Sequence, residues 1–171
     1  MYDMTRVMAN GYFDEGKSPE ELKAYRQKAS AQIAAERTID YKNDTYAMAE
    51  SVPVKVTPDM PQFVKDYSNF YETKLGYHER SYGSTSGATV TSAATFMNMP
   101  ILSYADEIET PVLMIHGEKA HSRYFSEDAF KKLKGDNKEL YIVPNAVHTD
   151  LYYKMDVIPF DKIETFFEMN L

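Results

Sequence analysis

The chain has 171 residues, of which 43% are hydrophobic, and 26 acidic side chains outnumber 19 Lys and Arg to leave a formal net charge of −7. This length and composition predict a globular domain with a hydrophobic core. The negative charge argues against nucleic acid or an anionic membrane as a partner, because neutralising phosphates requires clustered Lys and Arg. The chain has no cysteine, which excludes disulfides, thiolate nucleophiles and cysteine-ligated metals within it.

The start of the chain does not resemble a signal peptide, because polar residues such as Asp3, Arg6 and Asn10 interrupt every apolar run. No stretch is as long and apolar as a membrane span. We therefore expect a soluble, cytoplasmic protein, although a further segment upstream of Met1 would change that expectation.

Residues 1–110 are expected to be helical and rich in loops. The run Ser18-Pro19-Glu20-Glu21 is typical of a helix start, because the serine can cap the helix, proline suits its first position and the last glutamate completes a capping box. This helix is expected to reach about Arg37 with much of its surface facing water. Three prolines predict a loop over residues 51–61.

A second helix is predicted over residues 61–73, and the Gly-, Ser- and Thr-rich residues 76–92 are expected to be irregular. Aromatic side chains at helical spacing give the second helix one aromatic face, made of Phe63, Tyr67, Phe70 and Tyr71. Such a face is more often ordinary core than a binding surface. The alternative is that it lines an apolar acyl pocket.

Residues 111–171 alternate between predicted strands and helices. The apolar runs at 111–115 and 140–143 predict two buried strands, the first closed by His116-Gly117. Ser126 is predicted to cap the helix between them, and a last helix follows with its phenylalanines on one face. This order predicts an α/β fold with a parallel strand pair and a right-handed crossover. Two parallel strands cannot bury both faces alone, so we expect further strands to be missing from the chain.

His148 is the strongest candidate for chemistry among the four histidines. It follows the second predicted strand, and sites in open α/β sheets lie at the carboxyl ends of strands. A histidine there suits a general base, because its pKa is normally near neutral. The alternative is a solvent-exposed loop histidine.

Glu118 is the candidate to orient His148, because it directly follows the end of the first predicted strand. The alternative is a surface glutamate in a turn. Asp150 is too close to the histidine in sequence to be expected to point at its ring, and we assign it at most an indirect supporting role.

A nucleophile is harder to find. Residues 83–87 approach the Gly-x-Ser-x-Gly elbow, but the central residue is Thr85 and no buried strand precedes it, so a flexible loop is expected. His116 and His121 have no carboxylate pair at zinc-like spacing, and His116 is expected to end a buried strand with its ring hydrogen-bonded. His121 and Arg123 are expected to anchor their loop, with substrate contact as the alternative. No cofactor or metal is expected, since no nucleotide-binding fingerprint is present.

Two segments carry a resemblance to a known family. Pro111–Asp128 (PVLMIHGEKAHSRYFSED) resembles the penultimate-strand segment of bacterial α/β-hydrolases related to dienelactone hydrolase, and Glu139–His148 (ELYIVPNAVH) resembles their last strand and histidine loop. Shorter pieces continue the resemblance along nearly the whole chain, at residues 2–6, 10–12, 96–100, 150–152 and 158–162.

The resemblance implies an esterase-type hydrolase that attacks a carboxylic ester or lactone through an acyl-enzyme, with His148 as the base. It also implies that the first strands, the oxyanion-hole loop and the nucleophile elbow precede this chain. Residues 111–171 would then be the end of the hydrolase core, and residues 1–110 a lid or pocket-shaping excursion. Many members have Asp where this chain has Ala120, which leaves Glu118 as the candidate acid.

Two readings of function remain. In the first, the chain is the C-terminal half of a hydrolase for a small ester-like substrate, inactive alone because it lacks a nucleophile. In the second, it is a non-catalytic fragment or interaction module of the same origin. In both, an uncovered sheet edge and apolar faces predict self-association or pairing with a missing N-terminal half.

Overall fold

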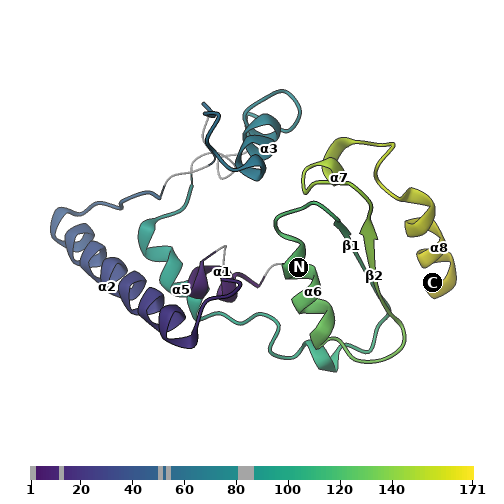
Figure 1. Ribbon diagram of the computed structural model, residues 1–171, viewed down its shortest axis with the longest axis horizontal. Helices are drawn as coiled ribbons and strands as arrows, with labels where there is room; N and C mark the ends of the chain where they lie inside the picture. The colour runs from purple at the N-terminus through teal and green to yellow at the C-terminus, as the bar shows by residue number, and fades with distance from the viewer. Residues whose placement is uncertain (1–2, 12–13, 50–51, 53–54, 81–86) are drawn as a thin grey trace. The chain divides into compact units, whose positions relative to one another are not determined.

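A computed structural model describes residues 3–11, 14–49, 52, 55–80 and 87–171 of the chain (Figure 1). These residues form two compact units, each assembled from separated segments. The helical unit contains Asp3–Ser51 and Arg80–Ile101, and the α/β unit contains Val52–Glu79 and Leu102–Leu171. The segment around residues 52–79 thus belongs with the strands, which differs from the division at residue 110 that the sequence suggests.

The helical unit is built on the long helix α2 (Pro19–Asn43), against which α1 (Met4–Asn10), the 3₁₀ turn η1 (Val90–Ser92) and α5 (Ala93–Met97) pack. The expected capping box is confirmed, because the Glu21 N–H donates to Ser18 Oγ at 3.2 Å and the Ser18 N–H donates to Glu21 Oε2 at 2.7 Å.

Helix α2 continues six residues beyond the predicted end at Arg37. No glycine or proline interrupts residues 38–43, and the helix ends only where Asp44 adopts a left-handed conformation with φ of 50°. Its buried side chains are Ile33 and Asp40, in agreement with the expectation that most of the helix faces water.

The α/β unit contains a parallel pair of strands, β1 (Val112–Gly117) and β2 (Lys138–Val143), in register from Val112 opposite Lys138 to Gly117 opposite Val143. Helix α6 (Arg123–Lys132) connects them. This confirms the predicted parallel pair with a helical crossover and places the described chain in the α/β class. Within the described residues the sheet has two strands.

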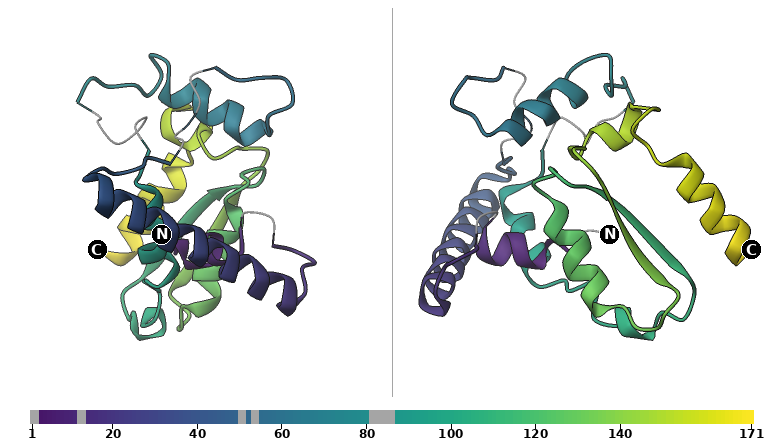
Figure 2. Two further views of the ribbon diagram at one scale, coloured as in Figure 1. Left: turned by 90° about the vertical axis from the view of Figure 1, so that its left-hand side faces the viewer. Right: turned by 45° about the vertical axis from the view of Figure 1, so that its right-hand side comes forward.

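One face of the sheet packs on α6 around a core of Leu102, Ala105, Met114, Ala129 and Leu133. Helix α8 (Phe160–Asn170) lies on the opposite side of the sheet from α6 (Figure 2). Its Lys162 pairs with Glu139 of β2 at 2.6 Å. Alternate residues of a strand point to opposite faces, so Met114 and His116 of β1 are buried on the α6 side, and Ile115 between them is only half-buried.

Some local predictions differ from the structure. Ser126 lies inside α6 and does not cap it, because the helix begins one turn earlier and the Ser126 hydroxyl bonds the His116 ring instead. The second helix, α3, spans Gln62–Tyr71 and is shorter than predicted. Residues 81–86, which hold most of the elbow-like Gly/Ser segment, lie outside the described residues. No helix among the described residues has the length and apolar character to cross a membrane.

Candidate functional site

The loop that carries His148 is held against the end of β1 by backbone contacts. The Glu118 N–H donates to the Val143 carbonyl and the Lys119 N–H to the Ala146 carbonyl, both at 2.9 Å. Gly117 permits this approach, because a Cβ at that position would lie 2.4 Å from the Ala146 carbonyl oxygen. The histidine is therefore fixed at the carboxyl end of the parallel strands, where the sequence predicted it.

Both ring nitrogens of His148 are hydrogen-bonded to hydroxyl groups. Nδ1 lies 2.5 Å from Ser122 Oγ, and Nε2 lies 2.5 Å from the Tyr152 hydroxyl oxygen. Tyr152 comes from the short helix α7 (Asp150–Tyr153), four residues beyond the histidine. His148 is half-buried and Ser122 is 1% exposed, so the Nδ1 side of the ring faces the interior.

The hydrogen bonds continue inward from Ser122. Its Oγ also lies 3.0 Å from Nε2 of His116, and Nδ1 of His116 lies 2.7 Å from Ser126 Oγ. His116 is 7% exposed and Ser126 is 5% exposed. The structure thus confirms that His116 ends a buried strand with its ring hydrogen-bonded. We call Ser126, His116, Ser122 and His148 the His–Ser chain.

Burial sets the charge state of these side chains. It lowers the pKa of His148 to about 4 and lowers the pKa of His116 below its usual value, because a buried imidazolium loses its hydration. Burial also raises the pKa of Tyr152, which disfavours its phenolate. At neutral pH both histidines of the His–Ser chain, His116 and His148, are uncharged, and Tyr152 keeps its proton.

The aromatic face of α3 forms one wall of the site. Phe63 stacks on the His121 ring with 4.0 Å between centroids, and Tyr67 meets the rings of His121 and His148 edge-on, each at 5.3 Å. The face is therefore packed against the catalytic candidate and is neither exposed nor part of a remote core. His121 lies between α3 and the His148 loop, a position that suits the anchoring role predicted for it.

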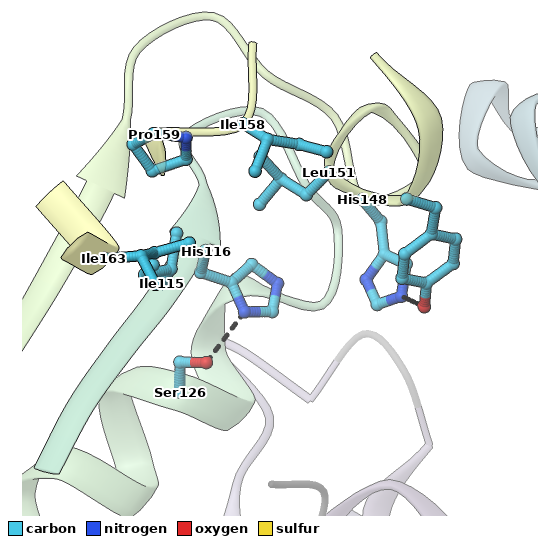
Figure 3. Close-up of a pocket in the computed structure, with 9 residues that line it drawn as sticks. Ile115, His116, Ser126, His148, Leu151, Ile158, Pro159 and Ile163 are labelled. Atoms are coloured by element: carbon cyan, nitrogen blue, oxygen red, sulfur yellow. Dashed lines mark hydrogen bonds between the residues drawn. The ribbon is translucent and has the colours of Figure 1, made fainter. Parts of the chain in front are cut away.

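A cavity of about 310 Å³ lies beside His148 (Figure 3). Its polar side is formed by His116, Ser126, His148 and Tyr152. Its other walls are aliphatic and are formed by Ile115, Leu151, Ile158, Pro159 and Ile163. A ligand there would meet a mostly apolar surface with the histidine at one side.

The two predicted site residues, His148 and Glu118, are not brought together by a hydrogen bond. The Glu118 carboxylate accepts the Asn145 N–H at 2.8 Å and so supports the turn before the histidine, where Asn145 has a left-handed φ of 59°. Asp150 accepts the Val147 N–H at 3.0 Å and pairs with Lys154 at 2.7 Å. Both carboxylates hold the loop by its backbone.

Sequence reasoning missed Ser122, Ser126 and Tyr152 as partners of the histidines. The four-residue spacing between His148 and Tyr152 was a usable signal, because residues four apart meet on a helical turn. Ser122 and Ser126 gave no such signal, because serine is common at helix starts and nothing nearby in the sequence marks either residue as a partner of a histidine. The described part of the chain contains no group of three or more His, Asp or Glu side chains that could hold a metal ion.

None of the known protein-family models matches the chain. It is similar over its whole length to the uncharacterized protein PA2218 of Pseudomonas aeruginosa, with 44% identity over 44% of that protein. The uncharacterized protein YcjY of Escherichia coli is 24% identical over 85% of this chain and 45% of its own length. The chain therefore spans less than half the length of these relatives.

The crystal structure of the hypothetical protein PA2218 matches the whole chain with a TM-score of 0.85 and 44% identity. The match covers 51% of the PA2218 chain. The arrangement of helices and strands described here is therefore similar to that in one half of a larger solved protein.

Proposed function

We propose that the chain is the C-terminal part of an α/β-hydrolase that cleaves carboxylic esters or lactones through an acyl-enzyme, with His148 as the general base. The observation that carries the proposal is the setting of His148 Nε2. This atom lies within hydrogen-bond distance of a hydroxyl oxygen, beside a mostly apolar cavity, at the carboxyl end of parallel strands. A general base must reach the hydroxyl that it deprotonates.

The chemistry follows from that geometry. A serine or cysteine side chain placed at Nε2, where the Tyr152 hydroxyl now lies, would lose its proton to the imidazole as it attacks the carbonyl carbon. The imidazolium would return this proton to the departing alkoxide. Water would then be deprotonated by the same nitrogen and would release the acid from the acyl-enzyme, restoring the nucleophile.

Neither nearby hydroxyl of this chain suits the nucleophile. Ser122 is 1% exposed, so a carbonyl carbon cannot reach it, and it lies on the Nδ1 side of the ring. Burial raises the pKa of Tyr152 and keeps its hydroxyl protonated. We therefore assign the nucleophile, the oxyanion hole and the remaining strands to residues outside these 171, in keeping with relatives of which the match covers less than half.

The cavity favours a small ester-like substrate with an apolar acyl group or lactone ring. Its aliphatic walls would stabilise such a group by burial, and its size suits a compact molecule. The segment that contains α3 would shape or cover the site. For this role, the packing of the aromatic residues of α3 against His148 is the supporting observation.

The test is to read and express the gene together with the coding sequence upstream of Met1. We expect an in-frame apolar strand followed by Gly-x-Ser/Cys-x-Gly, turnover of p-nitrophenyl acetate, and labelling of the elbow residue by a fluorophosphonate. His148→Gln should reduce turnover by about 10³-fold or more, as loss of a triad member does. Glu118→Gln in the same protein measures whether Glu118 contributes to catalysis.

Two results would overturn the proposal. One is an extended protein whose turnover survives His148→Gln. The other is robust hydrolysis by the 171-residue chain alone that His148→Ala abolishes, because the nucleophile would then lie within the chain. A stop codon directly upstream, with a good ribosome-binding site, would favour the interaction module over the enzyme.

A further inference from the structure

We propose that Ser122 and His116 are positioning residues that hold the His148 ring and keep its proton on Nδ1, the place at which a carboxylate acts in a Ser-His-Asp triad. The inference rests on the proposed role of His148 as a base, because only that role requires a lone pair on Nε2. The Ser122 hydroxyl and the His116 imidazole would then orient the His148 ring, a role that the sequence suggested for Glu118.

The geometry gives Ser122 two imidazole partners and a buried position. Its Oγ lies 2.5 Å from Nδ1 of His148 and 3.0 Å from Nε2 of His116. A hydroxyl has one proton, so it can donate to only one of the two rings and must accept from the other. The protonation of His116 and that of His148 are therefore linked through one oxygen atom.

The tautomer of His116 sets the direction in which protons are donated along the His–Ser chain. Its buried ring is neutral, and one of its nitrogens must accept. If Nδ1 donates to Ser126 Oγ, Nε2 accepts the Ser122 proton. Ser122 then accepts from Nδ1–H of His148, which leaves the lone pair of His148 on Nε2. Tyr152 donates its proton to that lone pair, so each of the four hydrogen bonds to the two rings has a donor and an acceptor.

If protons were donated in the reverse direction, from His116 through Ser122 to His148, then His148 could not act as a base. A proton on Nε2 of His116 would be donated to Ser122, and the serine would donate to Nδ1 of His148. The proton of His148 would then lie on Nε2, facing Tyr152, and the ring could not take a proton from a nucleophile at that position. His116 thus controls whether His148 is able to act, although it would touch no substrate.

The nearby carboxylates do not compete for this task. Glu118 is bound to the Asn145 N–H, and Asp150 is bound to the Val147 N–H and to Lys154. Among the described residues, the other titratable groups near the two rings are His121, Tyr67 and Tyr152, together with Arg123 and Glu127 of α6, which are paired with each other. A neutral orienter also agrees with the low pKa of His148, which burial of the ring lowers.

The test is ¹⁵N NMR of the histidine rings in the 171-residue chain at pH 7, because ring nitrogen shifts report the tautomer directly. We expect Nδ1–H for His148 and for His116. In Ser122→Ala, His148 should lose this preference and show averaged tautomers. In His116→Phe, Ser122 loses its acceptor and can donate to His148, which should shift His148 toward Nε2–H. A purely structural role would not give these two different outcomes.

Glu118→Gln is the matched control, because its amide oxygen can still accept the Asn145 N–H, and it should leave the His148 tautomer unchanged. The proposal is overturned if His148 of the unmodified chain is an Nε2–H tautomer, a result that needs no variant to fold. It is also overturned if Glu118→Gln shifts the tautomer and Ser122→Ala does not. The measurement uses no substrate, so failure of the hydrolase proposal in the turnover assay is a separate result.

Discussion

The Oγ of Ser122 lies 2.5 Å from Nδ1 of His148, although 26 residues separate them in the chain. This contact links the start of α6 to the loop after β2. Ser122 also contacts His116, so it fills the buried side of the His148 ring. The other nitrogen of the ring, Nε2, faces the Tyr152 hydroxyl beside the cavity.

Acid should destabilise the folded chain through His148. Burial lowers the pKa of this histidine from 6.5 to about 4 in the folded state, so the unfolded chain binds more protons between those values. The folded state therefore has its full stability with respect to this group above pH 6.5 and loses it as the pH falls toward 4. Allowing for solvent screening of the partly exposed ring, the loss of unfolding free energy is of order 2 kcal/mol.

Urea unfolding at pH 7 and at pH 4.5 measures this loss. His148→Gln should remove part of the pH dependence, and the remainder should come from His116 and His121, whose pKa values burial also lowers. An unchanged pH dependence in His148→Gln would contradict the prediction.

Removing the Tyr152 hydroxyl should expose the outer nitrogen of His148. Tyr152→Phe deletes the group that bonds Nε2, and the lone pair of Nε2 is the nucleophile that attacks an acylating reagent. We expect diethyl pyrocarbonate to modify His148 several-fold faster in this variant, as read by mass spectrometry of the histidine peptide. Tyr153→Phe, at the next residue, is the control. Equal rates in all three proteins would show that the hydroxyl does not shield the ring.

Gly117→Ala should destabilise the chain and move the His148 loop. The added Cβ would lie 2.4 Å from a backbone oxygen, which cannot yield as a flexible side chain would, and crowding of this kind typically costs about 1–3 kcal/mol. Gly16→Ala is the comparison, since its Cβ meets no atom within 4 Å and only its left-handed φ of 77° opposes the change.

Both variants should unfold at lower urea concentration, but only Gly117→Ala should change the ring signals of His148. A Gly117→Ala protein with native stability and unchanged signals would show that the loop does not depend on this close approach.

The chain alone should associate with itself. A two-stranded sheet has edges that no described strand covers, and apolar side chains such as Phe167 and Met169 of α8 are half or more exposed. Sedimentation velocity should show a weight-average mass that rises with concentration. Phe167→Lys should weaken the association, whereas Glu164→Gln, which changes the charge of the same helix by the same amount, should not. A monomer with one cooperative unfolding transition would contradict the prediction.

Local signals in the sequence were sufficient for much of the fold. The capping box at Ser18 and Glu21, the two apolar strands and their parallel pairing all follow from short-range patterns and were confirmed. The loop position of His148 follows from the same patterns, because a residue that closes a buried parallel strand must lie at the carboxyl edge of the sheet.

Other features depended on packing that no local pattern encodes. The length of α2 beyond Arg37 and the turn by which α6 starts before Ser126 reflect tertiary contacts and the absence of a strong stop signal. The place of residues 52–79 beside the strands likewise comes from contacts between segments far apart in the chain.

By itself, the sequence determined that an α/β unit presents His148 at a strand end. Only the tertiary structure decided which groups its ring contacts. Glu118 was the first acid after the first strand, but its carboxylate accepts the Asn145 N–H, and the buried hydroxyl of Ser122 contacts Nδ1 of His148 instead. The physical reason is that hydrogen bonding depends on direction and distances of about 3 Å, and these are set by how β1, α6 and the loop pack together.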